Sequence, residues 1–175
     1  ILLIMATEIR AIRPATLKDL PAIIQVIDAA RLIMRRNGDM AQWNDGYPSD
    51  ADVISDIHRH GAFVIVNNGV IVSYFACLLS PEPTYRIIDR GQWLDDIHPY
   101  HTIHRLGSLP NVHGIFKSVM DFCSSRYDNI RIDTHRDNKI MRHVIQEYGF
   151  SYCGIIYLAS GDARFAYQWI KGSCL

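Results

Sequence analysis

Apolar residues recur every three or four positions in four segments of the chain, and this spacing predicts four helices. The first segment follows Thr16 or Asp19, which can cap a helix, and ends at Gly38. In the second, Ser49 is a capping residue with Asp52 three positions later, and we expect that helix to stop at Gly61. The third segment covers residues 112–125 and the fourth covers residues 138–148.

Short runs of β-branched and apolar residues predict the strands. Residues 63–66 and 70–79 are joined through Asn67, Asn68 and Gly69, a strong hairpin signal. The other expected strands are residues 8–13, 102–108, 130–132, 152–158 and 165–169. Antiparallel hairpins therefore alternate with strand–helix–strand crossovers. We predict a mixed α/β fold with one central sheet of six to seven strands flanked by about four helices.

Length and composition narrow the class of protein. One domain covering residues 1–175 is expected, with residues 1–5 interpreted as an N-terminal remnant. Lys plus Arg equals Asp plus Glu, 18 each, so no global charge favours a nucleic-acid or membrane partner. The four cysteines are widely spaced and form no CxxC pair, which favours a reducing compartment. A cytoplasmic location is therefore expected.

Several motifs together carry a resemblance to a known family. IRPATLKDLPAI starts at Ile12, HRLGSLPNVHGIF at His104, IRIDTHRDN at Ile130 and EYGF at Glu147. With these motifs the chain resembles the GNAT acetyltransferases over nearly its whole length. More narrowly, it resembles a bacterial subgroup that carries QWxxGYP, IHR, IRIDTHxDNxxM and GFxYCGIIYL, all present here. The resemblance implies acetyl-coenzyme A as co-substrate and an amine of a small molecule or peptide as acceptor. The resemblance is also compatible with a homodimer.

The phosphate-binding loop of that family precedes a helix, and the matching segment here starts at Asn111. Gly114 supplies the first glycine of the family pattern, while Phe116 stands where glycine or alanine is usual. A loop that enters a helix presents backbone N–H groups and a positive dipole end to a diphosphate. The expected cofactor-binding residues are Leu106, Ser108, Asn111, Val112, His113, Gly114, Ile115, Phe116 and Asn138.

Acetyl transfer to an amine requires a base, and His104 is the candidate, because histidine titrates near neutral pH. Strand alternation places Thr102, His104 and Leu106 on one face, with His101, Ile103 and Arg105 on the other. The alternative is a structural histidine bonded within the sheet.

The family's usual general acid is a tyrosine seven residues after an asparagine, but that position here is Ile145. Tyr148, Tyr152 and Tyr157 are the substitutes, and Tyr157 is the candidate retained. Asp133 and His135 share a strand face and predict a polar network at the site, catalytic or structural. Asp133 is kept as a catalytic candidate and His135 as a substrate contact.

Large rings in irregular segments predict the acceptor pocket. Trp43, Tyr47, Trp93 and Tyr100 are these aromatic residues, and we expect two of the four to contact substrate. The alternative is that they close the ends of the core.

Two other classes of function remain at this stage. His98, His101 and His104 are spaced three residues apart, and three histidines could bind the metal ion of a metal-dependent hydrolase. On a strand, however, His101 points away from the other two, so no metal is expected. The second class is a GNAT-like module that binds coenzyme A or a protein without catalysis.

Overall fold

A computed structural model describes residues 10–173 of the 175-residue chain. The interpretation of residues 1–5, and the first two residues of the strand expected at 8–13, lie outside the described part. The elements are β1 (Arg10–Pro14), α1 (Leu20–Arg36), α2 (Asp50–His58), β2 (Ala62–Asn67), β3 (Val70–Leu79), β4 (His101–Ser108), α3 (Ile115–Ser124), β5 (Asn129–Thr134), α4 (Lys139–Tyr148), β6 (Ser151–Tyr157) and β7 (Ala163–Ile170).

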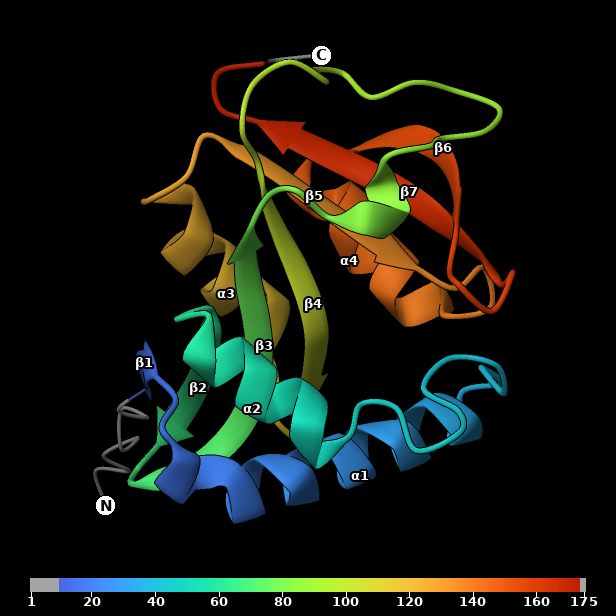
Figure 1. The fold of residues 1–175 in the computed structure, drawn as a ribbon. Coiled ribbons are helices and arrows are strands. Elements are labelled where there is room, and N and C mark those ends of the chain that lie inside the picture. Colours follow the sequence, from blue (N-terminus) through green and yellow to red (C-terminus); the bar gives the residue numbers. More distant parts are fainter. Residues whose placement is uncertain (1–9, 174–175) are drawn as a thin grey trace, which may run out of the picture.

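One mixed sheet holds all seven of these strands, in the order β1-β2-β3-β4-β5-β7-β6. The central pair β4 and β5 is parallel, and every other neighbouring pair is antiparallel. The predicted fold class, a mixed sheet of six to seven strands with four helices, is therefore confirmed (Figure 1).

Local signals set most element boundaries as expected. The Ser49 hydroxyl accepts the N–H of Asp52, whose carboxylate accepts the N–H of Ser49, so the predicted capping box starts α2. The Asn138 side chain accepts the N–H of Met141 and caps α4. Helix α3 begins at Ile115, three residues later than predicted, because the chain turns through left-handed Gly114 first.

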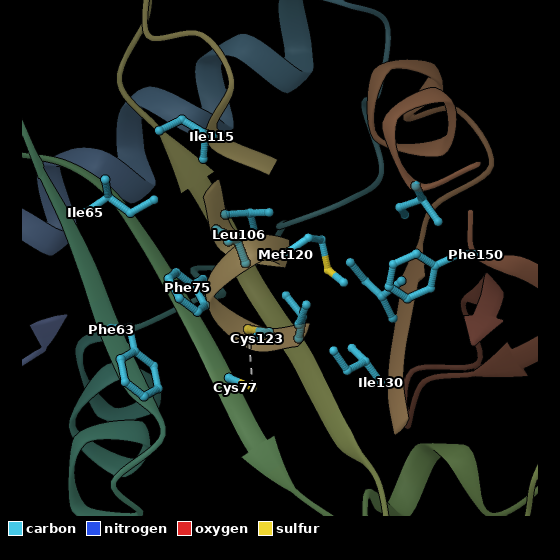
Figure 2. Close-up of a cluster of buried hydrophobic side chains, with 14 of the residues drawn as sticks. Phe63, Ile65, Phe75, Cys77, Leu106, Ile115, Met120, Cys123, Ile130 and Phe150 are labelled. Atoms are coloured by element: carbon cyan, nitrogen blue, oxygen red, sulfur yellow. Dashed lines mark hydrogen bonds between the residues drawn. The ribbon is translucent and has the colours of Figure 1, made fainter. Parts of the chain in front are cut away.

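The two faces of the sheet are covered by different segments. Helices α3 and α4 pack on one face, where the largest buried cluster lies (Figure 2). Helices α1 and α2 cover the other face over the first strands, and residues 81–100 cross that face over β5 and β7 (Figure 1). Within residues 10–173, no helix is both long and apolar enough to span a membrane.

Strands β4 and β5 separate after a short stretch of pairing. Only His101, Thr102 and Ile103 of β4 pair with β5, at Ile130, Arg131 and Ile132. From His104 onward the strands diverge, so this edge of β4 faces a gap in the sheet (Figure 1). A gap between parallel strands leaves backbone N–H and C=O groups for another extended chain.

A bulge at Arg105 reverses the facing of the rest of β4. Arg105 has a positive φ of 54°, and the register with β3 shifts at this point. Leu106 consequently joins Ile103 in the cluster under α3 and α4, while Arg105 contacts Asp56 of α2. The prediction that Leu106 shares a face with His104, and Arg105 with Ile103, is wrong for this reason.

Candidate active site

Two cavities meet where β4 and β5 separate. The first has a volume of about 690 Å³ and lies between the end of α1, the edge of β4, the turn before α3 and the start of α4. The second, about 450 Å³, lies between loop 41–47, the turn at residues 82–84 and the β6–β7 turn. Four residues line both cavities: Met34, Leu106, Asn138 and Met141. The gap in the sheet is therefore open to both.

Most of the expected cofactor-binding residues line the first cavity. They are Leu106, Ser108, Val112, His113, Gly114, Ile115, Phe116 and Asn138. Asn111 does not line it and instead holds a left-handed turn, with a φ of 62°. The structure thus gathers eight of the nine predicted residues around one space and leaves Asn111 beside it.

The start of α3 is suited to an anion. Gly114 is its N-cap and no side chain caps the helix, so the first N–H groups have no intrahelical partner. A Cβ added at Gly114 would meet only Arg10 Nη1, at 3.7 Å, so the backbone is open to close approach. Lys117 and Lys139 also line this cavity. The residues present therefore fit a ligand with several phosphates.

Arg10 of β1 positions the turn before α3. Its Nη2 donates to the carbonyl of His113 at 3.0 Å, and its Nη1 donates to the Ser118 hydroxyl at 3.0 Å. The guanidinium thereby links the first strand to both ends of the first turn of α3. No local sequence signal connects residue 10 with residue 113.

Arginines of α1 hold the loop that walls the second cavity. Arg35 donates to the carbonyls of Asp39 and Gln42, and Arg31 donates to those of Trp43 and Tyr47. Because these bonds fix the loop backbone, the side chains of Trp43 and Tyr47 are placed against the cavity. The second cavity has a preformed wall.

The side chain of Gln42 connects this loop to the opposite side of the gap. Its Oε1 accepts from the Thr134 hydroxyl and the His135 N–H, both at 3.2 Å, and from Asn138 Nδ2 at 3.3 Å. Gly107 allows the loop to approach β4, since a Cβ there would lie 3.1 Å from the Trp43 ring.

His104 lines the second cavity and is paired with Glu82. His104 Nε2 lies 2.9 Å from Glu82 Oε2, and the carboxylate also accepts the N–H and hydroxyl of Thr84. Burial opposes ionisation of Glu82, but the bonds and charge of His104 and the Thr84 bonds outweigh it and lower the pKa to about 2. Glu82 is therefore an acceptor only, and Nε2 of His104 carries the shared hydrogen.

Asp133 lies in the same cavity, bonded to a buried tyrosine. Its Oδ1 accepts the hydroxyl of Tyr85 at 2.6 Å. Burial, followed by the charge of Asp133, raises the pKa of Tyr85 well above its usual value, so the phenol stays protonated and donating. His135, two residues on, lies 3.7 Å from the buried Asp39 and lines neither cavity.

Arg105 has its charge matched within the protein. Its Nε donates to Asp56 Oδ2 at 2.7 Å, its Nη2 bonds the other oxygen, and its Nη1 donates to the Tyr47 hydroxyl. Tyr74 donates to the same carboxylate at 2.6 Å. The bulge at Arg105 is thus held by a buried polar network.

The four predicted acceptor aromatics separate into two pairs. Trp43 and Tyr47 line the second cavity, whereas Trp93 and Tyr100 line neither. The latter two enclose the guanidinium of buried Arg131, which lies 3.9 Å and 3.8 Å from their ring centres. Their role is to fasten residues 81–100 to the sheet.

Tyr157, His98 and His101 lie apart from both cavities. Tyr157 is 44% exposed at the end of β6 and bonds Asp89 rather than facing either cavity. His98 bonds Asp95, and the His101 ring stacks on Tyr127. Within residues 10–173, no group of three His, Cys, Asp or Glu residues is placed to hold a metal ion.

No family model matches the chain, and no curated protein matches it. Among solved structures, a GNAT family acetyltransferase from Streptococcus agalactiae 2603 has 32% identity and a TM-score of 0.83, covering 94% of this chain and 96% of its own. The chain belongs to the GNAT family of acetyltransferases.

More distant GNAT structures share the fold. An acetyltransferase from Listeria monocytogenes 4b F2365 has 18% identity and a TM-score of 0.69, covering 94% of this chain and 99% of its own. The NatC complex, solved bound to Gag peptide and CoA, has 12% identity and a TM-score of 0.61, covering 92% and 98%. The GNAT family uses acetyl-CoA, and the first cavity is the space whose residues fit that group.

Sequence reasoning missed three residues of this GNAT site. Glu82 has no local signal, because it lies in an irregular segment 22 positions from its partner His104. Arg164 lines the second cavity, but the sequence analysis assigned it no role. Gln42 could have been predicted as a positioning residue, since it is the polar residue that precedes Trp43 in the QWxxGYP motif.

Proposed function

We propose that this GNAT protein transfers the acetyl group of acetyl-CoA to the amine of a small molecule or peptide, with His104 as general base. The observation that carries the proposal is the junction of the two cavities at Met34, Leu106, Asn138 and Met141. A donor in the first cavity and an amine in the second would meet at the gap beside β4. Such placement of two reactants supplies much of the rate enhancement of a transfer reaction.

The reaction follows from this arrangement. The amine nitrogen attacks the thioester carbonyl, a C–N bond forms, the C–S bond breaks and the coenzyme A thiolate leaves. A protonated amine cannot attack, so a base must take its proton. Glu82 fixes the tautomer of His104 with hydrogen on Nε2, which leaves Nδ1 with the lone pair that accepts the proton, directly or through water.

The subgroup motifs support the same assignment. Gln42, Trp43 and Tyr47 of QWxxGYP, His104 of IHR and Asp133 of IRIDTHxDNxxM all line the second cavity. Motif residues that are far apart in sequence thus gather at one space. Asp133 and Tyr85 would hold the acceptor side of the site in place through their bond.

An amine panel tests this proposal. Purified protein is incubated with acetyl-CoA and amino acids, polyamines, aminoglycosides or peptides, with free thiol measured by absorbance and product by mass spectrometry. We expect at least one amine to give an acetylated product that depends on the protein. Tight binding of coenzyme A without product from any amine would favour the non-catalytic module instead.

A further inference from the structure

Arg164 of β7 is a buried cation that lines the second cavity without an acidic partner. The residue is 5% exposed, and its Nη1 donates to the carbonyl of Ala163 at 3.2 Å. Within residues 10–173 it has no other hydrogen bond, and no carboxylate lies within 4.0 Å of it. A guanidinium has five N–H donors, so most of the donor capacity of Arg164 is unused.

Such a residue is costly to keep in a fold. A buried charge without a counter-charge destabilises the protein, whereas a carboxylate can accept two parallel bonds from the guanidinium. Arg105, the other arginine lining this cavity, already has Asp56 as its partner. Of the two arginines, only Arg164 therefore has a charge that a ligand could match.

Three of the four acids that line the same cavity have other partners, and the fourth, Asp45, is exposed to solvent. Glu82 bonds His104, Asp133 bonds Tyr85, and Asp162 accepts the hydroxyl of Ser160 at 3.0 Å. The cavity therefore contains a candidate base, His104, and a guanidinium without a carboxylate partner, that of Arg164. A ligand that satisfies both carries an amine and a carboxylate.

We propose that the acceptor is an amino acid or a similar small amino-carboxylate, and that Arg164 binds its carboxylate. This inference rests on the proposed acetyl transfer. A cavity of about 450 Å³ lies within the range for small-molecule sites and accommodates a single amino acid. Arg164 would then be the residue that determines acceptor class.

The test compares matched acceptors on matched variants. Each amino acid is assayed beside its primary amide and its decarboxylated amine, for example lysine, lysinamide and cadaverine. For the best acceptor of the wild type we expect the acid to exceed the amide and amine by roughly 10- to 100-fold in kcat/KM. Arg164→Gln should remove that preference by raising the KM for the acid, and the KM for acetyl-CoA should stay the same.

Two further variants separate binding from folding. Arg164→Lys keeps the positive charge but lacks the two parallel N–H donors of a guanidinium, so it should retain part of the preference for the acid. Arg90→Gln, at an exposed arginine beside Asp89, should behave as wild type. Urea unfolding and coenzyme A affinity are measured for each variant, so a folding defect at position 164 is recognised.

Calorimetric titration of the same acids, amides and amines into the protein with coenzyme A keeps the two proposals distinct. Binding that requires both the carboxylate and Arg164, without turnover, would support the carboxylate site at Arg164 but would overturn acetyl transfer and, with it, the role of the bound acid as acceptor. Turnover of amines that is indifferent to the carboxylate, or unchanged in Arg164→Gln, would overturn the inference and leave acetyl transfer standing. Absence of any carboxylate-dependent binding or turnover would also overturn it.

Discussion

The pair of His104 and Glu82 brings together a strand and an irregular segment that have no sequence connection. The contact at 2.9 Å orients the imidazole and fixes which nitrogen can accept a proton. A structural histidine and a general base both use such a contact, but they differ in what the loss of the side chain does to the rate. Kinetics on single substitutions can distinguish them.

Replacement of His104 by alanine should lower kcat about 10²- to 10⁴-fold, the usual effect of losing a general base. The KM for acetyl-CoA should change little, because His104 lines the second cavity and not the first. A general base of this kind makes the wild-type rate rise with pH near neutrality, and this rise should be absent in His104→Ala. Steady-state kinetics across pH measure both effects.

His101→Ala is the matched control on the same strand, since His101 stacks on Tyr127 and lines neither cavity. Its kcat should stay near that of the wild type. An unchanged rate in His104→Ala, with a fall in urea stability, would assign His104 a structural role and direct the search for a base to Asp133.

Glu82 gives a second prediction, on stability against pH. Its pKa falls from 4.5 to about 2 in the folded protein, so the ionised form stabilises the fold above pH 4.5. That contribution is lost as pH falls from 4.5 toward 2. In this window the unfolding free energy of the wild type should fall more steeply than that of Glu82→Gln, by at most about 1.4 kcal/mol per pH unit.

Urea unfolding at several pH values between 2 and 6 measures the difference in slope. Glu147→Gln, at an exposed glutamate of α4, is the control and should follow the wild type. Parallel curves for the wild type and Glu82→Gln would show that the His104 contact does not stabilise the carboxylate in solution.

Arg131 illustrates which contacts a sequence pattern does not reveal. Trp93 and Tyr100 have the composition expected of a ligand pocket, and the pattern suggested that role. In the structure they enclose Arg131, which comes from β5 more than thirty residues later. Ring residues in an irregular segment pack against whatever the fold places beside them, so their partner could not be identified locally.

Elements whose defining contacts lie between residues close in sequence could be predicted. The hairpin at Asn67–Gly69 and the capping box at Ser49 are set within a few positions, and both are confirmed. The bulge at Arg105 was not, because it depends on Asp56 of α2 and on the register with β3. One extra residue in β4 reversed the expected facing of Leu106.

The start of α3 gives a prediction about the donor. Gly114→Val should weaken coenzyme A binding by at least about 10-fold, because a side chain at φ 71° strains the turn and covers the backbone N–H groups. Asn111→Ala should change the affinity far less, since Asn111 lies beside the cavity. It should instead cost about 1 kcal/mol of stability, as its φ of 62° suits asparagine better than alanine.

Calorimetry with coenzyme A and urea unfolding measure these two effects. S-acetylpantetheine, which lacks the diphosphate, serves as a control donor whose KM Gly114→Val should leave unchanged. Equal coenzyme A affinity in the wild type and Gly114→Val would place the phosphates away from α3.

In the whole molecule, the parallel pair β4 and β5 has fewer paired positions than any other pair of neighbouring strands in the sheet. Strands β1 to β4 with α1 and α2 contact strands β5 to β7 with α4 through three paired positions of β4, the Gln42 bonds, the segment 81–100 and the shared core under α3. A ligand that lies in the gap would add contacts to both halves. Its binding should therefore be visible in the stability of the whole fold and in the local protection of the gap.

Coenzyme A should raise the melting temperature, because a ligand that binds only the folded state stabilises it by about 2.7 kcal/mol at one hundred times its Kd. Hydrogen exchange should slow at two places, the start of α3 and the β4 edge from His104 to Ser108, which lacks pairing with β5. Adenosine 3′,5′-bisphosphate, which carries the nucleotide end without the pantetheine arm, should protect the first place only. Calorimetry showing no binding at millimolar coenzyme A would contradict the first cavity as its site. Protection confined to α3 with both ligands would show that the arm does not enter the gap between β4 and β5.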